Sequence, residues 1–294
     1  MLKSCRLCPR ACGANRTAGN VGYCKAGKEI KIARAALHFW EEPPISGENG
    51  SGTVFFSYCN MGCVFCQNYG ISHEHHGRTV TEGELAEIFI HLQKSGANNI
   101  NLVTPTHYVP QIKSALITAK KNGLAVPVVY NCGGYESVEA LKILDGLVDI
   151  YMPDMKYCSD KYAIKYSNAP GYFVYACKAI EEMYRQTGKN AFDENGLMKS
   201  GVLVRHMLMP GMLFDSKKIL DYLYESYGDN IYISIMNQYT PMPNAKNFPE
   251  INRRVDKKYY ETLVDYAEKL GITNAFVQSG EAIGESFIPE FWNE

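Results

Sequence analysis

The sequence contains no long apolar segment, and its charges almost cancel. A membrane-spanning helix needs about 18 or more consecutive apolar residues, and no run among the 294 residues approaches that length. The chain carries 30 basic and 31 acidic residues, giving a formal net charge of −1 at pH 7. We therefore expect no strong electrostatic attraction to nucleic acid or to an anionic membrane. These two absences argue against a membrane protein and make nucleic acid an unfavoured partner.

The N-terminus also lacks the apolar core of a secretion signal, because a lysine and a serine directly follow the first two residues. Ten cysteines without such a signal favour metal or redox chemistry in a reducing compartment over a disulfide scaffold. We therefore expect a cytoplasmic protein. The composition, 46% hydrophobic and 21% charged, is that of a globular chain with room for one α/β domain and a small attachment.

Three of the cysteines stand on one short loop. Cys59, Cys63 and Cys66 have the spacing C-x3-C-x2-C and follow the apolar run at residues 53–56. Three thiolates can hold three corners of a cubane iron–sulfur cluster, which leaves its fourth iron open to a small molecule. Gly62 suits such a loop, because it allows backbone conformations that a Cβ would forbid. Zinc is the weaker reading, since it requires four ligands and prefers paired cysteines.

A second group of cysteines lies at the N-terminus, where Cys5, Cys8, Cys12 and Cys24 give C-x2-C-x3-C-x11-C. So short a segment buries little apolar surface, and a bound metal would supply its folding energy. Four thiolates leave no open position, which favours a structural or electron-relay role. Iron–sulfur and zinc both accept four thiolates. We predict a second metal site of either kind, the alternative being a leader with free thiols.

Short apolar runs alternate with amphipathic helical patterns from residue 51 onward. Strands are predicted at residues 53–58, 99–104, 126–130, 148–152, 202–208 and 231–236. Helices are predicted after a capping box that runs from Thr81 to Glu84, and near residues 109–122, 136–144, 173–187, 216–226 and 255–270. A short apolar segment at residues 272–277 completes the pattern.

Six strands that alternate with helices form parallel βαβ units, which either close partly into a barrel or make an open doubly wound sheet. The cysteine loop follows the first strand and polar clusters follow the others, so the chemistry lies at the C-terminal ends of the strands, as in TIM-like barrels. We predict an α/β fold, with a partial (β/α)6 TIM-like barrel at residues 51–294. Before it we expect an irregular, cysteine-rich, metal-binding extension at residues 1–50.

The cysteine loop, with the aromatic Phe65 before its last cysteine, resembles the signature of the radical S-adenosylmethionine (SAM) enzymes. Five further runs look like the uncharacterised group of that superfamily related to pyruvate formate-lyase activating enzyme: CRLCPRACGANR (5–16), NINLVTPTHY (99–108), VYNCGGY (129–135), DIYMPDMKY (149–157) and VRHMLMPG (204–211). The resemblance covers nearly the whole chain. It implies a [4Fe-4S] cluster on the three cysteines, whose open iron binds SAM. One electron then yields methionine and a 5′-deoxyadenosyl radical, which abstracts hydrogen from a substrate.

The resemblance also implies a set of SAM contacts. Phe65 lies near the adenine, and Asp154 and Lys156 match an Asp-x-Lys pair that contacts the ribose and carboxylate. Relatives bind the SAM amino group with a Gly-Gly-Glu-like run at the end of the second strand. This chain has Thr104-Pro105-Thr106 there, so a hydroxyl or a backbone carbonyl would make that contact instead. The predicted SAM-binding residues are Phe65, Thr104, Thr106, Asn131, Asp154, Lys156, His206 and Gln238. Candidates for a catalytic role beyond the cluster ligands are Cys132, Cys158 and Tyr239.

Several of these residues have a structural alternative. Asp154 and Lys156 could form an ordinary surface ion pair, His206 could be a satisfied core histidine, and Tyr239 could be a packing residue. The histidines of the polar loop at residues 73–76 favour a solvated loop over a metal site, because their spacing is irregular.

The substrate class stays open between two readings. The first is activation of a glycyl radical enzyme, which the Asp-x-Lys match favours; the altered second-strand run and the cysteines placed before the loop count against it. The second is modification of a small metabolite, a peptide or an RNA. Either would need a flavodoxin or a ferredoxin as reductant. A remote alternative is an iron–sulfur electron carrier, which would rarely need so large a barrel.

Overall fold

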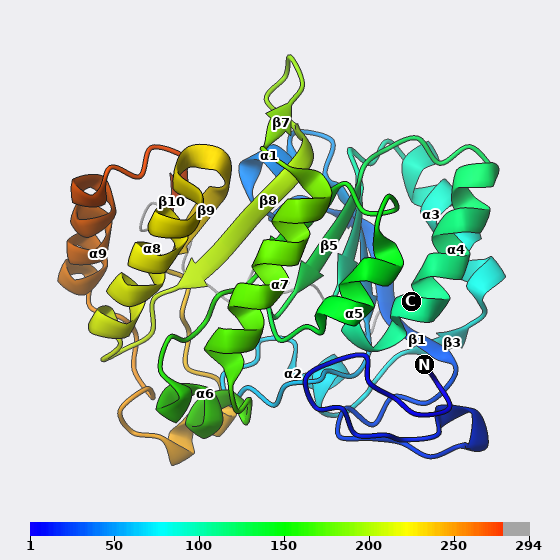
Figure 1. Ribbon diagram of the computed structural model, residues 1–294, viewed down its shortest axis with the longest axis horizontal. Coiled ribbons are helices and arrows are strands. Elements are labelled where there is room, and N and C mark those ends of the chain that lie inside the picture. Colours follow the sequence, from blue (N-terminus) through cyan, green and yellow to red (C-terminus); the bar gives the residue numbers. More distant parts are fainter. Residues whose placement is uncertain (279–294) are drawn as a thin grey trace.

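The computed structural model describes residues 1–278, and a mixed sheet forms its centre (Figure 1). The strands are β1 (Ile30–His38), β2 (Ser51–Phe56), β3 (Arg78–Val80), β4 (Ile100–Val103), β5 (Val128–Cys132), β6 (Ile150–Pro153), β7 (Ala191–Phe192), β8 (Met198–Met207), β9 (Tyr232–Met236) and β10 (Ala275–Val277). Residues 279–294, which belong to the predicted barrel unit, lie outside the described residues.

The strand order is β10-β9-β8-β6-β5-β4-β2-β1-β3, with β7 paired to β8 off this path. Neighbours from β10 to β2 run parallel, and β1 and β3 add an antiparallel edge. Within the described residues β10 and β3 stay at opposite edges, so the sheet does not close on itself. The predicted α/β partial barrel is confirmed.

All six predicted strands are present, with ends shifted by a few residues. Every residue of β2, β4, β5 and β6 is buried. Strands buried on both faces read as continuous apolar runs, which is why the sequence located them. In Figure 1 the labelled parallel strand β8 points downward, and α2 and the N-terminal extension lie below the sheet, on the side of its C-terminal strand ends.

The helices cover the sheet and connect its strands. They are α1 (Pro43–Ser46), α2 (Tyr69–Ser72), α3 (Glu82–Lys94), α4 (Val109–Lys121), α5 (Val138–Leu141), α6 (Asp160–Ser167), α7 (Tyr172–Thr187), α8 (Leu213–Tyr227) and α9 (Lys257–Leu270). Short 3-10 turns are η1 (Arg16–Ala18), η2 (Thr106–Tyr108), η3 (Lys142–Leu144), η4 (Gly228–Asn230) and η5 (Pro243–Asn247). The capping box is confirmed, since Thr81 and Glu84 bond reciprocally at the start of α3. No helix among residues 1–278 is both long and apolar enough to cross a bilayer.

The expectation that residues 1–50 are irregular is wrong for β1. This nine-residue strand pairs antiparallel with β2, for example Arg34 with Phe55, and carries β3 on its other side. Most of its residues are only half-buried, and positions such as Lys31 and Arg34 break the apolar run that marks an interior strand. The chain then continues through residues 39–42 to α1.

The first 27 residues pack against the C-terminal edge of the sheet and have one short turn, η1. Leu7 and Ala26 are buried in the core that the sheet shares with its helices. Arg16 is also buried, and its guanidinium donates to the carbonyl of His107, at 2.6 Å, and to that of Gly27. The extension is therefore fastened to the loop that follows β4.

Candidate functional site

A cavity of about 250 Å³ opens at the C-terminal edge of the sheet. The loop after β2 contributes all three cysteines of the C-x3-C-x2-C motif to its wall. The ends of the other parallel strands contribute the opposite wall. Eight residues predicted from the sequence as SAM-binding or catalytic line it: Phe65, Thr104, Asn131, Cys132, Asp154, Lys156, Gln238 and Tyr239.

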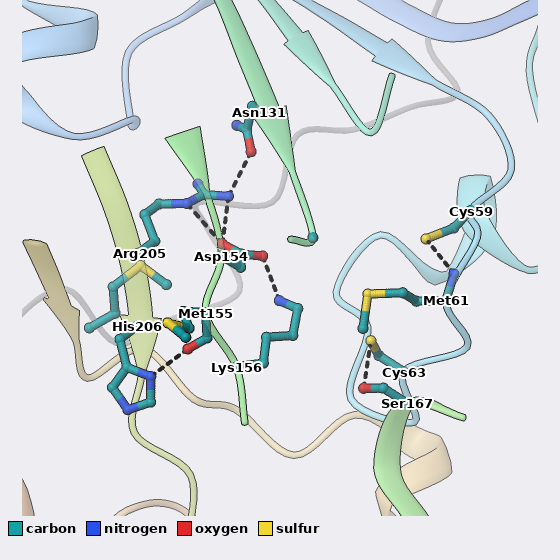
Figure 2. A network of polar contacts seen from close by, with 12 residues as sticks. Cys59, Met61, Cys63, Asn131, Asp154, Met155, Lys156, Ser167, Arg205 and His206 are labelled. Atoms are coloured by element: carbon teal, nitrogen blue, oxygen red, sulfur yellow. Dashed lines mark hydrogen bonds and ion pairs between the residues drawn. The ribbon is translucent and has the colours of Figure 1, made fainter. Parts of the chain in front are cut away.

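Each of the three cysteine sulfurs has a hydrogen-bond partner, and Figure 2 shows those of Cys59 and Cys63. The backbone N–H of Met61 donates to Cys59 Sγ at 3.4 Å, and the hydroxyl of Ser167 donates to Cys63 Sγ at 2.9 Å. Ser72 Oγ lies 3.2 Å from Cys66 Sγ. A thiolate accepts hydrogen bonds far better than a thiol does, so these partners suit metal-bound sulfur.

Burial raises the pKa of all three thiols, that of Cys66 to about 11. The proximity of Cys63 raises the pKa of Cys59 and of Cys66 further. Three buried thiolates would repel one another in this loop unless a cation neutralised them, and bound iron supplies that charge. The donor set therefore fits an iron–sulfur cluster.

The loop that carries these cysteines is held by backbone contacts with the end of α6. Gly62 N–H donates to the carbonyl of Ser167 at 3.1 Å, and Val64 N–H donates to that of Tyr166 at 2.9 Å. Gly62 has no left-handed backbone angle, contrary to the conformational reason expected for it. What it supplies is space, because a Cβ there would lie 2.7 Å from the Tyr23 hydroxyl of the N-terminal extension.

Asp154 is the centre of a polar network opposite the cysteines (Figure 2). Its Oδ1 accepts from Arg205 Nε at 3.0 Å, and its Oδ2 lies 2.5 Å from Lys156 Nζ. Burial alone would raise the pKa of Asp154, but the charges of Arg205 and Lys156 hold it below its usual value. Arg205 also donates to Asn131 Oδ1 at 2.7 Å. The pair of Asp154 and Lys156 is thus a buried part of the cavity wall.

Glu41 belongs to the same network, although no sequence pattern marks it as a site residue. It lies between β1 and α1, and its Oε2 is 3.3 Å from Arg205 Nη1. Its Oε1 accepts from Asn101 at 3.1 Å and from Asn131 at 3.2 Å. Arg205 belongs to the run VRHMLMPG (204–211) but is not among the predicted SAM-binding residues. Both residues line the cavity.

Two predicted SAM-binding residues do not line the cavity. Thr106 is buried and donates to Glu136 Oε1 at 2.6 Å. His206 is buried on the opposite face of β8 from Arg205, and its Nδ1 lies 2.7 Å from the carbonyl oxygen of Met155 (Figure 2). Burial lowers the pKa of His206 to about 4. Strand alternation turns His206 to the face opposite Arg205, and the hydroxyl of Thr106 is engaged with Glu136. Neither residue lines the cavity, so the arrangement gives no support to either as a SAM contact.

The three catalytic candidates lie in different surroundings. Cys132 touches the cavity, yet it belongs to the core on the helix side of the sheet and bonds to Glu136. Tyr239 lines the cavity with its ring and donates its hydroxyl to the carbonyl of Ile251 at 2.8 Å. Cys158 is half-buried, outside the cavity lining. A catalytic role for any of the three stays a prediction.

The N-terminal cysteines lie close enough to influence one another. Burial raises the pKa of Cys8 to about 12, and Cys24 and Cys5 raise it further. A Cβ at Gly22 would lie 2.3 Å from Cys12 Sγ, so that glycine leaves room for the sulfur. Among residues 1–278 no three or more His, Cys, Asp or Glu side chains converge tightly enough to hold a single metal ion.

The histidine-containing loop does not form a metal site in the described part of the chain. His73 stacks on Tyr69, with ring centroids 4.5 Å apart, and its Nδ1 lies 2.8 Å from Ser72 Oγ. His75 packs against Tyr58 at 4.6 Å.

Comparison with known proteins identifies the family. The family model of the Radical SAM superfamily matches residues 53–223. An uncharacterized protein of Methanocaldococcus jannaschii, MJ0674, is 31% identical in an alignment of 282 residues, and the match covers 92% of this chain and 76% of that protein.

Solved structures share the fold. Streptococcus suis SuiB bound to S-adenosylmethionine has a TM-score of 0.51 at 13% identity, with 75% of this chain and 48% of that chain covered. The FeFe-hydrogenase maturase HydG from Carboxydothermus hydrogenoformans has a TM-score of 0.52 at 10% identity, with 74% and 50% covered. This chain thus spans about half the length of these structures. With its cysteine loop at the C-terminal edge of a partial barrel, the chain belongs to the radical SAM superfamily.

Proposed function

We propose that Cys59, Cys63 and Cys66 hold a [4Fe-4S] cluster that cleaves SAM reductively, so that a 5′-deoxyadenosyl radical abstracts hydrogen from a substrate in the adjoining cavity. Membership of the superfamily implies both the cluster and SAM. One observation carries the assignment to these residues. The three thiols and the Asp154–Lys156–Arg205 network line the same cavity.

The residues of the opposite wall have the chemistry that SAM requires. The Lys156 ammonium suits the SAM carboxylate, and Asp154 suits ribose hydroxyls as an acceptor. Thr104 directly follows β4 and lies in the left-handed region, at φ 59°, which turns the backbone at the position where relatives bind the amino group. Phe65 and Tyr239, with ring centroids 5.9 Å apart, offer an aromatic wall for the adenine.

The N-terminal cysteines are proposed to hold a second metal, as an iron–sulfur cluster or as zinc. Their position supports a relay or a supporting role beside the first cluster. Arg10, between Cys8 and Cys12, donates through Nε to the carbonyl of Asn60 at 3.1 Å, inside the cysteine loop. Asn60 in turn donates to the carbonyl of Tyr135 at 2.6 Å. The extension therefore touches the loop directly.

For the substrate we propose a glycyl radical enzyme, activated in a reducing cytoplasm with electrons from a flavodoxin or a ferredoxin. The Asp154–Lys156 pair in the cavity wall supports this class. The second candidate is a peptide or a small metabolite, supported by the likeness in fold to SuiB, which has been solved bound to its precursor peptide SuiA at a TM-score of 0.50. An RNA substrate gains little support from a net charge of −1.

The test is SAM cleavage by the reconstituted, reduced protein, followed as 5′-deoxyadenosine. Replacing any one of Cys59, Cys63 or Cys66 with alanine should abolish the product. Cys177→Ala is the matched control, because this half-buried cysteine of α7 lies outside the cavity lining and should leave cleavage intact. Product formation that survives one of the three loop substitutions would overturn the assignment.

A further inference from the structure

One of the hydrogen bonds to the cysteine sulfurs comes from a distant part of the chain. Ser167, the last residue of α6, is fully buried and places its Oγ 2.9 Å from Cys63 Sγ, although 104 residues separate the two in the sequence. The hydroxyl of Tyr157 lies 2.8 Å from the same Ser167 oxygen. Tyr157 is also fully buried, so water does not compete for either hydroxyl.

The direction of the two hydrogen bonds, from Tyr157 to Ser167 and from Ser167 to Cys63, follows from the number of protons available. A cluster-bound thiolate has no proton and only accepts. Ser167 has one hydroxyl proton, which its bond to Cys63 uses. The Ser167 oxygen must therefore accept from Tyr157, and Tyr157 donates. Two hydroxyls aligned in this way polarise each other and strengthen the bond at the sulfur.

We propose that Tyr157 and Ser167 form a hydrogen-bond relay onto Cys63 that sets the reduction potential of the catalytic cluster, as positioning residues and not catalytic ones. This inference rests on the proposed function of the cysteine loop. Hydrogen bonds to ligand sulfurs are among the terms that fix iron–sulfur potentials. When one electron from a flavodoxin or ferredoxin enters the cluster, its negative charge grows. A donor at the sulfur stabilises that charge and raises the potential, and no proton is transferred.

The hydroxyl of Ser167 is separable from the structural contacts of the same residue. The loop is held by the carbonyls of Ser167 and Tyr166, which accept from Gly62 and Val64. These backbone bonds survive when the hydroxyl is removed. A purely structural role of Ser167 would therefore leave the potential of the cluster unchanged in Ser167→Ala.

The serine beside Cys66 is less firmly committed to its sulfur, because its hydroxyl has other partners. Ser72 also has one proton, but its oxygen lies 2.8 Å from His73 Nδ1 and 3.5 Å from the carbonyl oxygen of Tyr69. The carbonyl of Tyr69 competes for the proton of Ser72, and whether His73 Nδ1 accepts or donates depends on its tautomer. Ser167 instead has the tyrosine hydroxyl of Tyr157 behind it. We expect the relay at Cys63 to be the stronger influence.

The experiment is a redox titration of the reconstituted protein, followed by electron paramagnetic resonance (EPR). The signal to follow is the one that changes on addition of SAM, because only a cluster with an open iron responds. Ser167→Ala should shift the midpoint potential to more negative values, and Tyr157→Phe should shift it in the same direction by less. Ser159→Ala is the control, because its hydroxyl makes no capping bond at the other end of α6; its potential should equal that of the wild type.

An unchanged potential in both Ser167→Ala and Tyr157→Phe would overturn the relay. If Ser167→Ala fails to assemble a cluster, judged by iron content, Tyr157→Phe alone decides, since it leaves the serine in place. Failure of the proposed function has a different outcome, in which the wild type itself has no SAM-responsive cluster. A wild-type response with no shift in the variants contradicts only this inference.

Discussion

Glu41 and Arg205, separated by 164 residues in the sequence, form an ion pair of 3.3 Å in the wall of the cavity. The glutamate comes from the segment that links the antiparallel strand β1 to the parallel part of the sheet, and the arginine comes from β8. Both side chains are largely buried. The pair therefore ties the N-terminal part of the chain to the polar network around Asp154.

Glu41→Ala should destabilise the fold. Removing one partner of a buried pair leaves the other charge only partly compensated, which costs about 3 kcal/mol in the free energy of unfolding. Glu261→Ala breaks an exposed pair with Lys257 and should cost less than about 0.5 kcal/mol. Denaturant unfolding of the two variants gives the comparison, and equal stability would refute the structural importance of Glu41.

Lys156→Met should weaken SAM binding by about tenfold or more, since a hydrogen bond to a charged group contributes about 1.5–3 kcal/mol. Lys199→Met is the control, because its ammonium lies near the surface, 3.7 Å from Asp193. Equilibrium dialysis of SAM against unreduced, reconstituted protein measures both. If Lys156→Met binds SAM as tightly as the control, the assigned contact is wrong.

The double variant Cys8→Ser, Cys24→Ser should lose the second metal and keep the first cluster. The wild type should then contain more metal than the variant. The difference should be about four irons if the second site holds an iron–sulfur cluster, or about one zinc if it holds zinc. Cys177→Ser should keep the full metal content. Elemental analysis of the three proteins settles the identity of the metal, and an identical content in all three would exclude an N-terminal site.

His206 should make the protein less stable in mild acid. Burial lowers its pKa to about 4, from an ordinary value of 6.5, so the unfolded chain binds a proton more readily than the folded one. The contribution of neutral His206 is complete above pH 6.5 and is lost as the pH falls toward 4. Between pH 6.5 and 5 we expect a loss of about 1.5 kcal/mol. His206→Gln should lose less over that range in unfolding experiments, and an equal loss would contradict this account.

The sequence predicted the features that depend on local pattern. Continuous apolar runs located the six parallel strands, and Thr81 and Glu84 located the start of α3. The spacing of the cysteines, together with the strands before and after them, identified the edge of the sheet where the cavity lies.

Features that depend on the direction of a side chain were harder to predict. Thr106 and His206 were correctly placed at strand ends but face away from the cavity. Strand alternation distinguishes His206 from Arg205 only when the inward face is known. The sequence could not identify Glu41 and Ser167 as residues of the site, because the partner of each, Arg205 and Cys63, lies more than 100 residues away along the chain.

The most direct test of the radical SAM assignment is EPR of the anaerobically reconstituted, reduced protein before and after addition of SAM. The account predicts a [4Fe-4S]⁺ signal that changes shape with SAM, followed by release of 5′-deoxyadenosine. A well-formed cluster whose signal SAM leaves unaltered, with no 5′-deoxyadenosine, would contradict it and favour an electron carrier.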